Sequence, residues 1–215
     1  IFLSGGTRIR NAGISLNCEP FAEGTSITIE NYVDNPSFEI GTAMANWATS
    51  GGTITRETDK AKYGTASVRQ VRTDAADVIA SQSFSVFTAN DTISLQAWYM
   101  HESKTQTNMK PTLKIRLKNS SGSIVQTEST LDTATGTDWK KFTIDNVNIS
   151  ATAGTGTVTV ELSYEGVSGS GTARWDAIML VKATASPTYG FASGRRVYNH
   201  FDDNGQEHIN YLDIY

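Results

Sequence analysis

Cysteine is almost absent from this chain, which contains one, Cys18, among 215 residues. A single cysteine forms no intramolecular disulfide and cannot build a metal site of several thiolates. The chain also has no apolar run approaching the roughly 18 residues that a membrane-spanning helix requires. The sequence therefore excludes a disulfide-stapled fold and a cysteine metal cage, and it indicates no helical membrane span.

Blocks of basic residues are missing as well. The chain carries 18 basic and 22 acidic side chains, for a formal net charge of −4. Without a basic cluster to neutralise phosphates, nucleic acid is a poor candidate partner. No signal-peptide pattern is present in the sequence.

Motifs of nucleophilic or metal-dependent catalysis are also missing. The histidines are His101, His200 and His208, and none lies in a Gly-x-Ser-x-Gly or His-Glu-x-x-His pattern. Glu161 and Glu165 have the same strand parity, but nothing predicts a deep cleft around them. His200 and His208 flank an Asn-Gly turn, where they either face each other and bind a metal or are solvated or interface histidines. We predict that the chain is not an enzyme.

The residues that are abundant favour strands. Thr, Ser, Gly, Val and Ile are frequent, and long helical runs of Leu, Ala, Glu and Lys are absent. From Tyr32 onward, strand-like segments recur about every 8–20 residues between Gly, Ser, Asn and Asp turns. This spacing is typical of a β-sandwich or barrel.

Alternation within these segments predicts which side chains face the core. In ISLQAWYM one face holds Ile93, Leu95, Ala97 and Tyr99, and the other holds Ser94, Gln96 and Trp98. The segments TLKIRLKN and TVTVELSY alternate in the same way, whereas WDAIMLVKA is almost continuously apolar, as expected of a strand covered on both faces. We predict an all-β fold, an antiparallel β-sandwich of the jelly-roll kind.

The ends of the chain depart from this rhythm. Residues 1–31 are predicted to form an extended N-terminal arm or edge segment, and residues 32–186 the sandwich. In residues 187–215, an Asn-Gly lies between two aromatic-rich extended pieces, a strong signal for a β-hairpin. A lone hairpin is marginal in water, so this one is expected to pack on the sandwich or on another chain.

The order of several motifs resembles one family of domains. NPSFE, Trp47, DKAKYGTASVR, ISLQAWYM, DWKKFTI and ARWDAIML follow one another between Asp34 and Ala183. This order resembles the carbohydrate-binding-module-like jelly rolls. The following MLVKATASPTYGFASG looks like the exit of such modules in minor and distal tail proteins of tailed phages, although their common Tyr-Phe-Asp-Gly reads Tyr189-Gly190-Phe191-Ala192 here.

The resemblance implies a calcium ion that ties the first strand to the last. Its implied ligands are the carboxylates of Glu39 and Asp176 and backbone carbonyls near Lys60 and Lys62. Calcium prefers about six to eight oxygen ligands, which carboxylates and turn carbonyls supply. The alternative is that the two carboxylates form ion pairs with Lys60, Lys62 or Arg174.

A sugar site requires an aromatic platform among polar side chains. Alternation places Trp98 on an outward face with Gln96, and Arg116 and Glu161 on similar faces of other strands, so these four are the candidate carbohydrate-binding residues. The alternative is that a loop, an arm or a neighbouring subunit covers Trp98. Trp47, Trp139 and Trp175 are expected to pack in the core or at its rim.

These features predict a structural virion protein of a tailed phage, a tail or baseplate component. Its partners would be other virion subunits in an oligomeric assembly, and it would bind host cell-surface glycans during adsorption. Two alternatives share the fold: a carbohydrate-binding module of a secreted glycoside hydrolase, and a capsid decoration protein that binds no sugar. Localisation is accordingly expected to be the virion, or secretion under the hydrolase alternative.

Overall fold

A computed structural model describes residues 31–41, 43–73, 76–150 and 156–182, together with the backbone of four short strands at 28–30, 196–198, 200–201 and 207–208. Within these ranges the chain forms strands, turns and bends and no helix. No described segment is therefore a helix of the length and hydrophobicity needed to cross a membrane.

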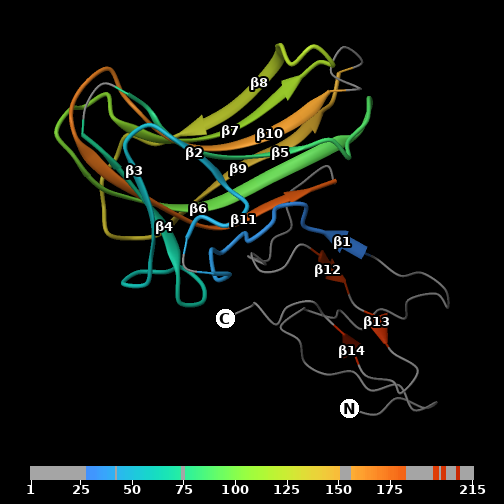
Figure 1. Ribbon diagram of the computed structural model, residues 1–215, viewed down its shortest axis with the longest axis horizontal. Helices are drawn as coiled ribbons and strands as arrows, with labels where there is room; N and C mark the ends of the chain where they lie inside the picture. The colour runs from blue at the N-terminus through green and yellow to red at the C-terminus, as the bar shows by residue number, and fades with distance from the viewer. Residues whose placement is uncertain are drawn as a thin grey trace.

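Ten strands form two antiparallel sheets of five. The first, here the β10 sheet, has the order β2-β5-β10-β7-β8, and the second, the β11 sheet, has the order β3-β4-β11-β6-β9. The strands of the β10 sheet are β2 (Ala48–Ser50), β5 (Val78–Phe84), β10 (Thr157–Glu165), β7 (Lys110–Lys118) and β8 (Ile124–Leu131). Those of the β11 sheet are β3 (Thr53–Glu57), β4 (Ser67–Arg72), β11 (Gly171–Val181), β6 (Thr92–Lys104) and β9 (Lys140–Asn148). Figure 1 shows the two sheets as stacked layers, which confirms the predicted β-sandwich.

The core lies between the two sheets and is built from alternate residues of the long strands. The inward positions of β6, β7 and β10 are buried as the alternation predicted: Ile93, Leu95, Ala97, Tyr99, Leu113, Ile115, Leu117, Val158, Val160, Leu162 and Tyr164. Aromatic rings fill the middle of the β11 sheet, where Tyr99 stacks on Phe142 and both rings lie 6.0 Å from Trp175. Trp47 and Trp175 are buried and Trp139 is half-buried, so all three have the expected core or rim positions.

Strand β11 is buried at every position, as its nearly continuous apolar sequence predicted. Asn31 and Tyr32 form hydrogen bonds to the second half of β11. The side chain of Asn31 donates to the Ile178 carbonyl and accepts from the Leu180 amide, at 3.0 Å each, and the Tyr32 amide donates to the Leu180 carbonyl. The first and last parts of the sandwich therefore meet along β11, as expected.

The remaining strands lie outside the two sheets. β1 (Thr28–Glu30) pairs with β12 (Arg196–Tyr198), and β13 (His200–Phe201) pairs antiparallel with β14 (Glu207–His208). His200 lies opposite His208 in this register, which confirms the hairpin around the Asn-Gly sequence. The rest of the predicted arm and C-terminal extension, Cys18 included, lies outside the described residues, and the domain boundaries stay predictions.

Candidate functional site

The four predicted carbohydrate-binding residues lie on two different sheets. Trp98 and Gln96 belong to β6 in the β11 sheet, whereas Arg116 on β7 and Glu161 on β10 belong to the β10 sheet. The outward faces of the two layers of a sandwich point in opposite directions. Trp98 and Gln96 therefore lie on a different face of the molecule from Arg116 and Glu161, because alternation identifies the face of a strand but not the sheet that the strand joins. That the four residues bind carbohydrate stays a prediction.

Trp98 is not an open platform, because the β3–β4 loop covers it. The Lys62 ammonium nitrogen lies 4.1 Å from the centroid of the indole ring, and the Tyr63 ring meets Trp98 edge-on at 6.2 Å. A Lys ammonium over a Trp face is a favourable cation–π contact. Gln96 and Ser94 are fully buried, which contradicts the open polar face expected beside Trp98. The alternative that a loop covers Trp98 is the one observed.

Asp176 is a fully buried carboxylate that anchors the same loop. Its Oδ2 accepts from the Lys62 amide at 2.6 Å and from the Tyr63 amide at 2.9 Å, and its Oδ1 accepts from the Ala177 amide at 2.6 Å. Burial raises the pKa of Asp176 to about 7; the three amide donors oppose this rise, and the charge of Glu39 adds to it. The residue is therefore poised between its neutral and charged forms near neutral pH.

Glu39 holds the next residues of the loop. Its Oε1 accepts from the Thr65 and Ala66 amides at 2.8 Å each, and its Oε2 accepts from the Thr65 hydroxyl at 2.7 Å. Gly64 has a φ of +72° and leaves no room for a side chain, since a Cβ there would lie 2.4 Å from Glu39 Oε1. The two carboxylates together fix the turn that covers Trp98.

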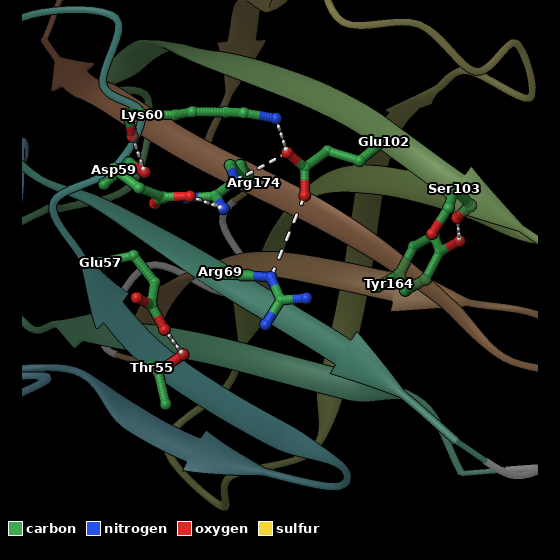
Figure 2. A network of polar contacts seen from close by, with 10 residues as sticks. Thr55, Glu57, Asp59, Lys60, Arg69, Glu102, Ser103, Tyr164 and Arg174 are labelled. Carbon is green, nitrogen blue, oxygen red and sulfur yellow. Dashed lines mark hydrogen bonds and ion pairs between the residues drawn. The ribbon is translucent and has the colours of Figure 1, made fainter.

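The basic residues near Glu39 and Asp176 form ion pairs with other carboxylates, those of Glu102 and Asp59. Figure 2 shows Lys60, Arg69 and Arg174 converging on Glu102, with Nζ of Lys60 at 2.5 Å and Nε of Arg174 at 3.0 Å from its Oε1. Arg174 also pairs with Asp59 at 2.6 Å. Lys62 lies on Trp98 instead, so the alternative of ion pairs from Lys60, Lys62 or Arg174 to Glu39 or Asp176 is wrong.

The surroundings of Glu39 and Asp176 offer oxygen ligands of the kind that calcium prefers. Besides the two carboxylates, the Lys60 carbonyl lies in this turn, where it accepts from the Ser67 hydroxyl at 2.6 Å. Lys62, in contrast, meets Asp176 through its amide N–H. Within the described residues no three His, Cys, Asp or Glu side chains gather as a metal site, so an ion here would rely on backbone oxygens. Carboxylate and carbonyl oxygens are donors of the type that calcium takes, and the ligand roles of Glu39, Asp176, Lys60 and Lys62 stay predictions.

The outward face of the β10 sheet carries a row of charged and hydroxyl side chains. Arg116 Nε lies 2.8 Å from Glu161 Oε2, and Lys114 forms an ion pair with Glu165. Sequence reasoning placed Arg116 and Glu161 on a polar outward face, and both do lie on one, on neighbouring strands.

A hollow lies at the β5 side of this face. Its volume is about 380 Å³, and its lining is Asp34, Asn46, Ala48, Ser81, Gln82, Ser83, Phe84, Ser85 and Val86. Gln82 is fixed against the backbone of Asp34, accepting from its amide at 3.0 Å and donating to its carbonyl at 2.6 Å. Sequence reasoning missed these residues because only the pairing of β2 with β5 brings segments 34–48 and 81–86 together.

His101 lies on β6 of the β11 sheet and packs against Tyr164 of the β10 sheet. It is buried, and its Nε2 lies 2.9 Å from the Tyr164 hydroxyl, which donates to the Ser103 carbonyl at 2.8 Å. Burial lowers the pKa of His101 to about 4, so its imidazole is neutral at neutral pH. Glu161 and Glu165 are each held by a cation. That the chain is not an enzyme stays a prediction.

Comparison with known proteins identifies the fold. No protein-family model and no curated protein sequence matches the chain. A family 61 carbohydrate-binding module in complex with β-1,4-galactotriose has 22% identity and a TM-score of 0.53, over 71% of this chain and 99% of its own. The C-terminal family 22 carbohydrate-binding module of Clostridium thermocellum xylanase 10B has 15% identity and a TM-score of 0.54, over 77% and 99%.

A phage protein is also similar. The enzymatically active domain of bacteriophage CBA120 tailspike protein 4 has 14% identity and a TM-score of 0.54, over 70% of this chain and 21% of that chain. At these identities the likeness establishes the fold alone. The chain has the β-sandwich fold of carbohydrate-binding modules.

Proposed function

We propose that this protein binds glycans through the outward face of its β10 sheet. The observation that carries the proposal is the hollow of about 380 Å³ beside the charged row on that face, in a fold shared with carbohydrate-binding modules. Sugar sites combine a concave surface with a few fixed polar groups. The face that carries Trp98 is the weaker choice, because Lys62 and Tyr63 cover the ring.

The biological setting we propose is the virion of a tailed phage, where the protein is a tail or baseplate component that contacts other subunits and adsorbs to host glycans. The similar tailspike domain supports this setting. The second candidate, a binding module of a secreted glycoside hydrolase, is favoured by the similar xylanase module.

A structural calcium ion between Glu39 and Asp176 is part of the proposal. Among the described residues no cation pairs with Glu39 or Asp176, and two neighbouring carboxylates of this kind favour a divalent ion; both also hold the loop over Trp98. An ion bound only by the folded state would stabilise the protein by mass action.

Blocking the hollow tests the proposed function. Ser83 is exposed on β5 at the edge of the hollow, so Ser83→Trp should fill it and weaken glycan binding at least about tenfold. Thr143→Trp is the matched control, because Thr143 is exposed on β9 in the other sheet. Binding is measured on a glycan array and on host cell-surface polysaccharide.

Three outcomes separate the functions. Retention of host surface polysaccharide supports the phage role, and retention of plant polysaccharide alone supports the hydrolase module. Absence of binding to every glycan overturns the proposal and favours a decoration protein. Equal loss in the Ser83 and Thr143 variants would also contradict the chosen site.

A further inference from the structure

We propose that the outward face of the β10 sheet selects acidic glycans, binding the ring carboxylate of a uronic acid at Arg116 and Lys114. This inference rests on the proposed function and names the class of sugar that the face prefers.

The charge of this face differs in sign from that of the whole chain. Strand β7 contributes four cations at its outward positions, Lys110, Lys114, Arg116 and Lys118, and β10 contributes two anions, Glu161 and Glu165. The outward positions of the other three strands hold only uncharged residues: Ala48, Ser50, Ile79, Ser81, Ser83, Thr127, Ser129 and Leu131. The face is therefore positive on a chain whose formal net charge is −4.

One buried polar atom of this face is unmatched. Ser163 Oγ has no hydrogen-bond partner among the described residues, whereas Arg116 Nε, Glu161 Oε2 and Glu165 Oε1 lack a hydrogen bond but take part in ion pairs. Arg116 and Glu161 approach to 2.8 Å without the alignment of a hydrogen bond, so the guanidinium keeps donor capacity for a ligand.

Arg116 is the more exposed member of its ion pair, with 25% of its side chain exposed against 12% for Glu161, whereas the side chains of Lys114 and Glu165 are both 16% exposed. The guanidinium fork matches a carboxylate, and charge-assisted hydrogen bonds of this kind are roughly twice as strong as neutral ones. Glu161 and Glu165 hold the two cations in place on the sheet before any ligand arrives.

Aromatic stacking is not available on this face. None of the outward residues in its five strands is Trp, Tyr or Phe. A neutral sugar would find hydrogen-bond partners there but no stacking surface, and it has no charge to pair with the cations of β7. An acidic sugar gains the stronger contacts to Arg116 and Lys114.

The spacing suits a short oligosaccharide that starts in the hollow. Ser81 lies opposite Glu161, which lies opposite Lys114. Strands lie about 4.8 Å apart, so Lys114 is about 10 Å from the wall of the hollow across the sheet. One sugar unit would lie in the hollow, and a later unit of the same oligosaccharide would lie at Lys114 and Arg116.

The test compares oligogalacturonate with its methyl ester, which has the same backbone without the charges. Calorimetry on the full chain should show the free acid binding at least about tenfold more tightly than the ester, with affinity falling as salt rises. Arg116→Gln combined with Lys114→Gln should remove this preference. Lys141→Gln, which removes an exposed cation from β9 in the other sheet, should leave it intact.

A second variant keeps the test informative if the double variant unfolds. Glu161→Gln removes the competing carboxylate from Arg116, so the free acid should bind more tightly than to the wild type, a gain that a purely structural ion pair would not give. Equal binding of acid and ester overturns the inference and leaves the proposed function standing, provided that neutral glycans bind. Equally tight binding of single-stranded DNA also overturns it, since the face would then be a general polyanion surface. Absence of binding to every glycan overturns both proposals.

Discussion

At the scale of single residues, Asp176 makes the stability of the protein depend on pH. The pKa of its side chain is raised to about 7 from a usual value of 3.8, so the folded state holds a proton that the unfolded state releases between these pH values. Stability should therefore fall as pH rises from about 4 to about 7, by an amount on the order of 1.4 kcal/mol for each unit of pKa shift. Thermal melts in a calcium-free buffer series check this slope. Asp176→Asn should remove it, and an unchanged slope in that variant would contradict the assignment.

Calcium should reverse this trend if it binds between Glu39 and Asp176. At pH 8 the ion would neutralise both carboxylates and raise the melting temperature, whereas Asp176→Asn and Glu39→Gln should not respond. Magnesium is the control, because it demands tighter octahedral geometry and retains its waters. An equal response of wild type and both variants would place any bound calcium elsewhere.

Gly64 offers a second test at this scale. Gly64→Ala forces a Cβ to within 2.4 Å of Glu39 Oε1 at a φ of +72°, so it should destabilise the fold by about 2–3 kcal/mol. Gly122→Ala is the matched control, since its φ is +80° but nothing lies within 4 Å of the added carbon. Denaturant unfolding should show that Gly122→Ala lowers the free energy of unfolding by about 1 kcal/mol, which is the backbone conformational cost alone. Equal losses would mean that the Glu39 contact is unimportant.

At the scale of elements, β11 depends on a residue that precedes the sandwich strands. Asn31 makes two buried hydrogen bonds to β11, to the Ile178 carbonyl and from the Leu180 amide. Asn31→Ala leaves both backbone groups without these partners and should cost about 2–4 kcal/mol of unfolding free energy. Asn148→Ala, at an exposed position of β9, should change it by less than about 0.5 kcal/mol. Denaturant unfolding measures both, and similar losses would contradict a special role for Asn31.

The elements themselves were largely predictable. The alternation in residues 93–99, 113–117 and 158–164 gave the correct inward face of three strands, because side-chain direction depends only on position within a strand. The Asn-Gly hairpin was also correct at the level of backbone pairing. The burial of Gln96 was not predictable, because the alternation does not show what lies over the outer face of a strand.

At the scale of the whole molecule, the described core lies within residues 32–181, since every residue of its two hydrophobic clusters, and Tyr32 packed against the larger one, falls in that range. A chain of residues 31–186, which keeps Asn31, should therefore fold and melt cooperatively on its own and bind glycans as the full chain does. Light scattering should show that any oligomer formed by the full chain is lost in this shorter one. A shorter chain that fails to fold would show that the terminal segments are part of the domain.

The sequence by itself determined the fold class and the inward faces of the long strands. These depend on short-range alternation and on the resemblance carried by a few ordered motifs. Only the tertiary structure decided that Trp98 lies under Lys62 and that Arg116 and Glu161 are on the opposite sheet from it. The physical reason is that the partners of a strand come from distant parts of the chain: β10 lies between β5 and β7, and no local pattern encodes that choice.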